Sequence, residues 1–228
     1  MTQYPAKRIM LTRKKKSKGK VKNLIAIIGA GGHAKCVYEC LAMQRQQVMG
    51  FFDDEPGKKG QVLISELKVI DSVDKLNMYN NISGIFVAIG DNKLRLELYH
   101  KYKSKYIFPN AVHVKAYISE FAKMGKGNFT MGNGIINPGS RIGNYCIVNT
   151  GTTVGHDCVL EDGAQLGPGV NIAGGSKIGK GVFLGVGAKV GPGVTIGDWS
   201  VIGAGSVVLN DLPGNGFFCG CPAKEKNK

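Results

Sequence analysis

An apolar residue returns at every sixth position through the C-terminal half of the chain. The series runs without a gap from Val112 to Val208, and Thr130 is the one member that is not apolar. An α-helix repeats near 3.6 residues and a flat strand at 2, so neither produces this period. A six-residue repeat is typical of a β-helix, in which each repeat is a short strand plus a corner. One repeat cannot bury its apolar residue alone, so we expect stacked turns around a continuous core.

Glycine accompanies this repeat. The chain contains 34 glycines. Nine of them directly follow an apolar position of the series: Gly125, Gly143, Gly155, Gly167, Gly179, Gly185, Gly191, Gly197 and Gly203. We expect these glycines at the corners, where they supply backbone angles that other residues reach only at a cost.

A different pattern precedes the repeat. Residues 24–28 form a short apolar run, which suits a buried parallel strand. Gly29, Gly31 and Ala34 follow in the spacing G-x-G-x-x-G/A, and a helix is expected from Lys35 to about Gln46. In such a turn the glycines let a phosphate approach the backbone, and the helix N-terminus favours its negative charge. The spacing therefore indicates either a nucleotide-binding turn or a tight turn that only packs a helix on a sheet.

The length of this unit limits what it can bind. A second strand is expected at Val48–Phe52, ending in Asp53 and Asp54, and a third at Ile82–Ile89, closed by Gly90. A further helix is expected from Leu94 to about Lys103, and the boundary with the repeat near residue 109. The unit spans about 85 residues, which gives room for one mononucleotide half and not for the two halves of a dinucleotide fold. We therefore do not expect the unit to bind a full dinucleotide such as NAD.

Four motifs together resemble one known family. The stretches I-I-G-A-G-G-H-A-K, G-F-F-D-D and V-A-I-G-D-N precede the repeat, and G-C-P-A-K at Gly220–Lys224 follows it. The combination resembles the PglD/NeuD family of sugar acyltransferases over roughly residues 23–224. The resemblance implies a Rossmann-like α/β domain at 23–108 that binds a nucleotide-linked (UDP-type) amino sugar. It implies a left-handed β-helix at 109–228 that binds acetyl-CoA as co-substrate, and a homotrimer.

The resemblance also implies site residues. Those expected to contact the nucleotide sugar are Gly31, Gly32, His33, Asp53, Asp54, Gly90 and Asn149. Those expected to contact acetyl-CoA are Gln165, Gly174, Val186 and Ala204. Gln165 departs from a histidine found in some members of the family. Backbone N–H groups at such positions could hold a thioester carbonyl as negative charge develops on it.

Acetyl transfer to an amine needs a general base, and histidine is the commonest one. Of the four histidines, His33, His100, His113 and His156, only His156 lies well inside the repeat. It stands two residues after an apolar position, so its side chain should point away from the core. The sequence H-D-C at 156–158 resembles the H-E-C of the family, in which the histidine is the base and the neighbouring acid raises its basicity. Asp157 replaces that glutamate, which keeps the charge and shortens the reach.

Three classes of function follow. The leading hypothesis is N-acetylation of the 4-amino group of a nucleotide sugar in surface-glycan synthesis. O-acetylation of a sialic-acid-like sugar, as in NeuD-like members, stays open because the sequence does not separate amine from hydroxyl acceptors. A zinc β-helix enzyme of the γ-carbonic-anhydrase type needs about three histidine ligands, and between residues 114 and 228 there is only His156, so no metal is expected. A binding protein without activity is the third class, and the intact H-D-C argues against it.

Charge and cysteines complete the prediction. The net charge is +14, but residues 1–22 carry nine basic residues and no acid, so this basic tail is expected to be solvated and disordered. We expect no nucleic-acid partner, because the tail has no aromatic residue beyond Tyr4 between its charges. We also expect no stable membrane insertion, because no apolar run approaches the ~20 residues that span a bilayer. Six cysteines without a paired C-x2-C spacing, and the lack of a signal peptide, predict free thiols in the cytoplasm.

Overall fold

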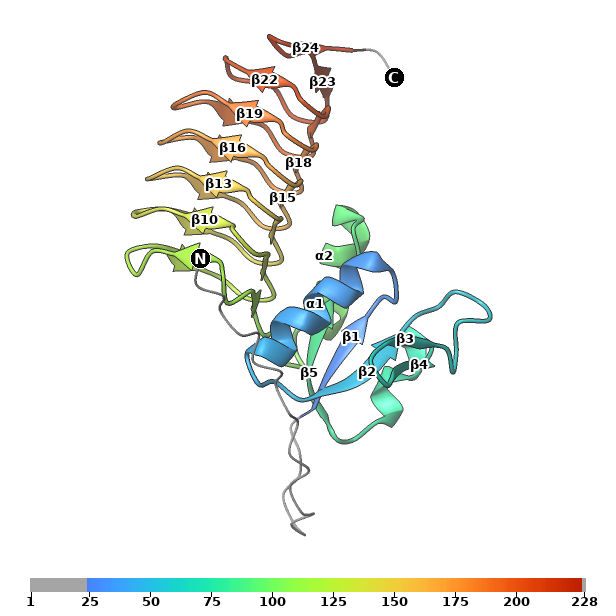
Figure 1. Cartoon of the computed structure of the whole chain (residues 1–228). Helices are drawn as coiled ribbons and strands as arrows, with labels where there is room; N and C mark the ends of the chain where they lie inside the picture. The colour runs from blue at the N-terminus through green and yellow to red at the C-terminus, as the bar shows by residue number, and fades with distance from the viewer. Residues whose placement is uncertain (1–23, 227–228) are drawn as a thin grey trace, which may run out of the picture.

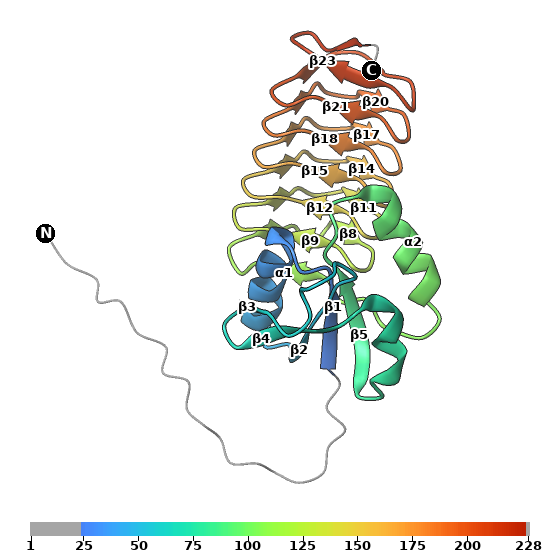
Figure 2. The ribbon, with the colours of Figure 1, turned by 90° about the vertical axis from the view of Figure 1, so that its right-hand side faces the viewer.

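The computed structural model describes residues 24–226, so the basic tail at 1–22 lies outside the described part. An α/β unit comes first and is followed by a tall stack of short strands (Figure 1). The α/β unit lies beside the first turns of the stack, and the remaining turns continue beyond it to the C-terminal end (Figure 2). The order of the two expected architectures along the chain is confirmed.

The α/β unit is a five-stranded sheet in the order β3-β4-β2-β1-β5. Its strands are β1 (Leu24–Ile28), β2 (Val48–Phe52), β3 (Val62–Ile64), β4 (Leu67–Asp71) and β5 (Ile82–Val87). β1 pairs in parallel with β2 and β5, and only the β3–β4 pair is antiparallel. The helices are α1 (Gly32–Met43), the 3-10 helix η1 (Val73–Met78) and α2 (Asn92–Tyr102). The segment with β3, β4 and η1 carries no strong period and was not predicted.

Both long helices begin earlier than expected. α1 starts at Gly32, inside the glycine turn, because Gly31 already has the extended conformation of an N-cap residue. The helix stops at Met43, and Arg45 just beyond it has a left-handed φ of 59°. α2 starts at Asn92 because the carboxylate of Asp91 accepts the backbone N–H of Leu94 at 2.9 Å. That contact satisfies one of the free donors of the first turn.

The stack is a three-sided parallel β-helix whose strands form three long sheets, here called faces I, II and III. Face I contains β6 (Ala111–Val112), β9 (Phe129–Thr130), β12 (Ile147–Val148), β15 (Gln165–Leu166), β18 (Phe183–Leu184), β21 (Val201–Ile202), β23 (Phe217–Cys219) and β24 (Lys224–Glu225). Face II contains β7 (Tyr117–Ile118), β10 (Ile135–Ile136), β13 (Thr153–Val154), β16 (Asn171–Ile172), β19 (Lys189–Val190) and β22 (Val207–Val208). Face III contains β8 (Lys123–Met124), β11 (Arg141–Ile142), β14 (Val159–Leu160), β17 (Lys177–Ile178) and β20 (Thr195–Ile196).

The six-residue series forms the core of this β-helix. Each member is the second residue of a two-residue strand, and its side chain points inward. From Ile136 to Val208 every member is almost fully buried, and Thr130 is buried in the same column as its apolar neighbours. Apolar residues of the corners, such as Val170, Val182 and Val194, complete the core. The period therefore predicted the core correctly.

The glycines do not act as expected. Those that follow the series directly lack left-handed φ values. At most of them, though not at Gly191, a side chain would collide with the next turn. A Cβ on Gly155, for example, would lie 2.6 Å from the backbone nitrogen of Gly174. The left-handed corner residues stand two positions later, as Gly175 and Gly187 do at φ 72° and 70°. Close approach of stacked backbones, and not corner geometry, explains the glycines of the motif.

The α/β unit packs on the lower part of face I. The outward residues of the first three strands of face I, Ala111, Phe129 and Ile147, are buried in one cluster with residues of α1 and β1. α2 lies along the corner between faces III and I, where Tyr99 stacks on Tyr145 with ring centroids 3.9 Å apart. This docking places the carboxyl end of β5 beside face I of the β-helix.

Two further observations concern the described residues. Within 24–226, neither long helix is both long and apolar enough to cross a lipid bilayer. The six cysteines are all free thiols in the structure; Cys40, Cys146 and Cys158 are buried, and Cys221 is exposed. Burial raises the pKa of the Cys40 and Cys146 thiols to about 12, so these groups are protonated at neutral pH.

Candidate active site

His156 and Asp157 form an exposed pair at the corner between faces II and III. Both side chains are 71% exposed, and His156 Nδ1 lies 2.8 Å from Asp157 Oδ2. With Nδ1 held by the carboxylate, Nε2 is the ring nitrogen left free to accept a proton. The expected outward direction of His156 is thus what the structure has, and the shorter acid still reaches the ring.

Two glycines make room for this pair. A Cβ on Gly174, one turn further along, would lie 2.4 Å from His156 Nε2. A Cβ on Gly139, one turn before, would lie 2.2 Å from Asp157 Oδ1. The imidazole and the carboxylate therefore fill spaces that only glycine leaves open. Gly174, predicted for acetyl-CoA, is brought directly against the predicted base.

The other residues predicted for acetyl-CoA lie elsewhere on the prism. Val186 and Ala204 are exposed at the corner between faces I and II, on the same edge as Asn149. Gln165 lies on face I itself, at the start of β15. His156 and Gly174 stand at the opposite edge of face II. Within one chain, the predicted site is therefore divided between the two edges of that face.

The glycine turn of the α/β unit is open. Gly31 and Gly32 are exposed, and a Cβ on either would meet nothing within 4 Å. His33, by contrast, points toward the β-helix and meets Phe129 edge-to-face, with centroids 4.7 Å apart. Its buried Nε2 has no hydrogen-bond partner. Burial, together with the nearby Arg95 charge, lowers the pKa of His33 to about 4. His33 thus lies in the domain interface as a neutral imidazole.

Asp53 and Asp54 hold the loops around this turn. Asp53 accepts the backbone N–H of Ala30 at 2.6 Å and that of Glu55 at 2.9 Å, and it forms an ion pair with Lys58 at 3.3 Å. Burial acts to raise the pKa of Asp53, but these donors outweigh it and the pKa is lowered. Asp54 accepts the N–H of Val73 at 2.7 Å. Both predicted ligand-binding carboxylates therefore already have partners within the chain.

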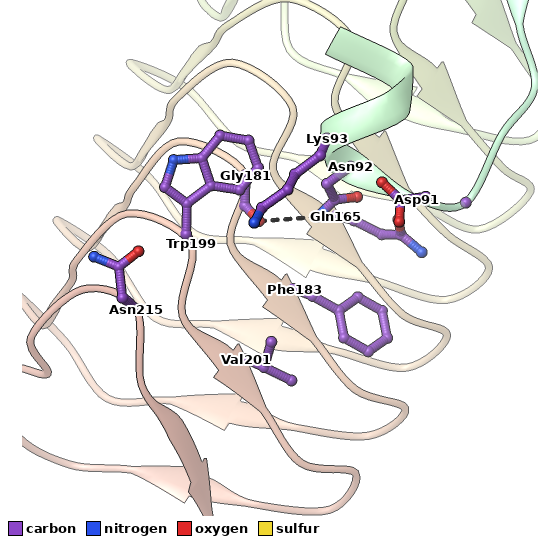
Figure 3. A pocket seen from close by; sticks show the side chains of 10 residues that line it. Asp91, Asn92, Lys93, Gln165, Gly181, Phe183, Trp199, Val201 and Asn215 are labelled. Carbon is purple, nitrogen blue, oxygen red and sulfur yellow. Dashed lines mark hydrogen bonds between the residues drawn. The ribbon is translucent and has the colours of Figure 1, made fainter. Parts of the chain in front are cut away.

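A cavity of about 520 Å³ lies between the start of α2 and face I (Figure 3). Gly90 and Gln165, predicted for different ligands, both line it. Phe183, Val201 and Trp199 form its apolar part. The amide of Asn92 donates to the carbonyl of Gly181 at 2.9 Å and joins the two walls. The structure thus connects the carboxyl end of β5 with the middle of face I.

Sequence reasoning missed Phe183, Val201 and Trp199. A signal for the first two was present: the outward residues of face I recur every eighteen positions and are almost all apolar. Arg95, buried beside the cavity, was also missed, and its charged neighbours on α2 gave no signal. Among the described residues, no group of three or more histidine, cysteine, aspartate or glutamate side chains is arranged to hold a metal ion.

Comparisons with known proteins match both parts of the chain. The family model described as PglD N-terminal domain matches residues 24–102, and the bacterial transferase hexapeptide model matches 157–191 and 175–210. PerB from Caulobacter crescentus, solved in complex with CoA and GDP-perosamine, is 41% identical, with a TM-score of 0.84 over 89% of this chain and 97% of PerB. The acetyltransferase domain of PglB from Neisseria gonorrhoeae, solved with acetyl coenzyme A, is 30% identical, with a TM-score of 0.83 over 90% of this chain and 100% of that domain.

The chain belongs to the PglD/NeuD-like family of sugar acetyltransferases. It is therefore an acetyltransferase by family, and the resemblance found in the sequence is confirmed. Uncharacterized protein L142 of Acanthamoeba polyphaga mimivirus is 31% identical over 123 residues, which make up 24% of that protein. The family's α/β domain and hexapeptide repeats correspond to the two units described above.

Proposed function

We propose that the protein transfers an acetyl group from acetyl-CoA to the 4-amino group of a nucleotide-linked amino sugar, with His156 as general base. The observation that carries the proposal is the His156–Asp157 pair, held at 2.8 Å over Gly174 on an exposed edge of the β-helix. In this mechanism the free Nε2 takes the proton from the attacking amine. The new C–N bond forms as the thioester C–S bond breaks, and CoA leaves as the thiolate.

The α/β domain is proposed to hold the nucleotide sugar at the carboxyl ends of β1, β2 and β5. Open α/β sheets bind ligands at that edge, and Gly31, Gly32 and Gly90 leave it uncovered. Asp53 and Asp54 support the loops there by accepting the backbone N–H groups of Ala30 and Val73. For the nucleotide, the family suggests UDP, whereas PerB at 41% identity was solved with GDP-perosamine. The proposal includes both nucleotides, and the assay below separates them.

We further propose a homotrimer with the reaction centre between copies. The residues predicted for the site line both edges of face II, so one copy's edge must meet another copy's opposite edge to unite them. Exposed apolar residues at the N-terminal end of this face and at its two edges support this: Val114, Tyr117, Phe121 and Ile135. Exposed apolar groups gathered in one place mark interaction surfaces more often than chance.

The experiment is a screen of nucleotide amino sugars with acetyl-CoA, following release of the free thiol. UDP- and GDP-linked 4-amino sugars form the main arms, and a sialic-acid-like acceptor with only hydroxyl groups forms the third. Turnover with an amino sugar, lost when the amine is already acetylated, supports the proposal. Turnover with the hydroxyl acceptor alone would replace it with O-acetylation, and hydrolysis of acetyl-CoA with no acceptor dependence would contradict both.

A further inference from the structure

The outward residues of face I form a column that changes character at one position. In register from the lower end they are Ala111, Phe129, Ile147, Gln165, Phe183, Val201 and Phe217. Gln165 is the one member with a hydrogen-bonding side chain. It stands where the α/β unit ends and the cavity begins. At this border the side-chain amide of Gln165 can form hydrogen bonds with the protein on one side and with a ligand in the cavity on the other.

The partner on the protein side is Arg95 of α2. Arg95 is 1% exposed, and its guanidinium lies between the two domains. Nε donates to the Tyr145 carbonyl and Nη2 to the Gly163 carbonyl, each at 2.9 Å, which fixes Arg95 to the β-helix. The remaining donors reach the loop after β5 and the cavity wall: Ile89 O at 2.9 Å, Asn92 Oδ1 at 2.8 Å, Gly90 O at 3.4 Å and Gln165 Oε1 at 3.4 Å.

This contact determines which way the Gln165 amide faces. Arginine only donates hydrogen bonds, so the amide atom turned toward Arg95 must be the oxygen. The Nε2 group, with its two N–H donors, is then the part left to face the cavity. Asn92 offers no competing donor there, because its own Nδ2 donates to Gly181 O at 2.9 Å and to Val182 O at 3.4 Å. The cavity therefore presents N–H donors that match an oxygen acceptor on a ligand.

The environment keeps this arrangement fixed. Among residues 24–226, no carboxylate forms an ion pair with Arg95, and all its acceptors are neutral oxygens. Burial lowers the pKa of Arg95 to about 10, which leaves the guanidinium charged at neutral pH. A buried charge without its acceptors is costly, so Arg95 holds the carbonyls and amides around it in place.

We propose that Arg95 is a positioning residue for the transfer reaction, which orients Gln165 so that its N–H donors bind an oxygen of one co-substrate in the cavity. The inference rests on the proposed function. The ligand oxygen can be a carbonyl of acetyl-CoA or an oxygen of the nucleotide sugar. Arg95 touches neither ligand and acts through Gln165.

The test compares Arg95→Met, Arg95→Lys, Gln165→Met and the double variant Arg95→Met/Gln165→Met. Lys101→Met, which removes an exposed cation from the same helix, is the matched control. Dissociation constants for CoA and for the nucleoside diphosphate are measured separately by calorimetry, and KM and kcat by thiol release. Binding does not depend on turnover, so a wild type that binds both ligands but acetylates no sugar would refute the proposed function and leave this test intact.

We expect Arg95→Met and Gln165→Met each to raise the dissociation constant of one of the two ligands about 10- to 100-fold, which is the size of one lost polar contact. The KM for that ligand should rise while kcat changes much less, and Arg95→Lys should recover part of the loss. The double variant should be no weaker than Gln165→Met, because both changes remove the same contact. The ligand whose dissociation constant rises is the one that supplies the oxygen bound by Gln165.

Additive losses in the double variant, or unchanged affinity for both ligands in folded variants, would overturn the proposal. If Arg95→Met fails to fold, the variant Gln165→Glu tests the proposal instead. Its carboxylate can still accept from Arg95 but offers the cavity no donor, so it should melt no lower than wild type and lose the same affinity. A Gln165→Glu protein with wild-type affinity for both ligands would show that Arg95 is merely structural.

Discussion

Asp157 has a backbone conformation that glycine occupies at most equivalent corners. Its φ is 56°, close to the 72° of Gly175 one turn later. Aspartate tolerates this left-handed region better than most residues do. The conformation places the Asp157 carboxylate beside His156, and Gly139 leaves it space. The replacement of the family's glutamate by aspartate is therefore compatible with the pair.

Gly174→Ala should displace the His156 ring without unfolding the protein. A Cβ would lie 2.4 Å from Nε2, and because the ring is exposed it can swing outward at little cost to the core. Turnover should fall about 10- to 1,000-fold, since misplacing a base approaches the cost of removing it. The measurement is kcat together with thermal unfolding. Gly191→Ala at the same corner, where the nearest atom is 3.3 Å away, is the control. Equal kcat values in the two variants would contradict the account.

The buried His33 gives stability a pH dependence. Its pKa of about 4 in the folded protein lies below the ~6.5 of an unfolded histidine, so the unfolded chain binds more protons. Stability should be fully present above pH 6.5 and decline as the pH falls toward 4, by about 1–2 kcal/mol at pH 5. Denaturant unfolding of wild type and His33→Gln at pH 7 and 5 measures this. The variant should lose less than wild type, and equal losses would refute the assignment.

At the scale of elements, α2 is matched to the turns of the β-helix. Leu96 packs over Gly163, Tyr99 over Tyr145, and Lys93 lies 5.8 Å from the Trp199 ring centroid. Tyr145 and Trp199 occupy the same corner position as Gly163, one turn before and two turns after it. At this corner Tyr145 and Trp199 therefore contact α2 through their side chains, whereas Gly163 leaves space for Leu96.

Gly163→Ala should weaken the docking of α2. A Cβ there would lie 2.7 Å from Leu96 Cδ1, and overpacking of this kind costs about 1–3 kcal/mol. Gly187→Ala shares the left-handed φ but meets nothing within 4 Å, so it carries the backbone strain alone. Thermal unfolding should show Gly163→Ala to be the less stable of the two. If both melt at the same temperature, α2 is not held by this contact.

The period of the repeat predicted the buried positions of the β-helix correctly. It could do so because one buried position per strand leaves a direct trace in sequence. The ends of α1 and α2 could not be predicted as well, since they depend on Gly31 and on the carboxylate of Asp91. The roles of the glycines were misassigned, because collisions between turns are visible only after the turns are stacked.

At the scale of the whole molecule, the structure brings together predicted site residues that lie far apart in the sequence. His156 and Gly174 proved to be neighbours, and the cavity joined Gly90 to Gln165. Arg95 could not be found, because its role depends on contacts with residues 50 and 68 positions away. Long-range docking of a helix on the β-helix leaves no local pattern to detect.

The proposed trimer predicts that a charge on the lower end of face II breaks the assembly. Tyr117 is 57% exposed there, so Tyr117→Lys should leave each β-helix folded while disfavouring burial of the face. Light scattering should show a trimer for wild type and smaller species for the variant. Thr195→Lys on face III is the control and should stay trimeric. A wild type that is monomeric at working concentrations would refute the assembly.

The most direct test of the account is the turnover of His156→Ala with acetyl-CoA and the best nucleotide amino sugar. Removal of a positioned base costs about 10²–10⁴ in rate, or roughly 3–5 kcal/mol in the barrier. We predict a loss of kcat of that size with the thermal unfolding temperature and CoA affinity unchanged, because the side chain is exposed and outside the core. A His156→Ala enzyme with near wild-type kcat at neutral pH would contradict the central claim.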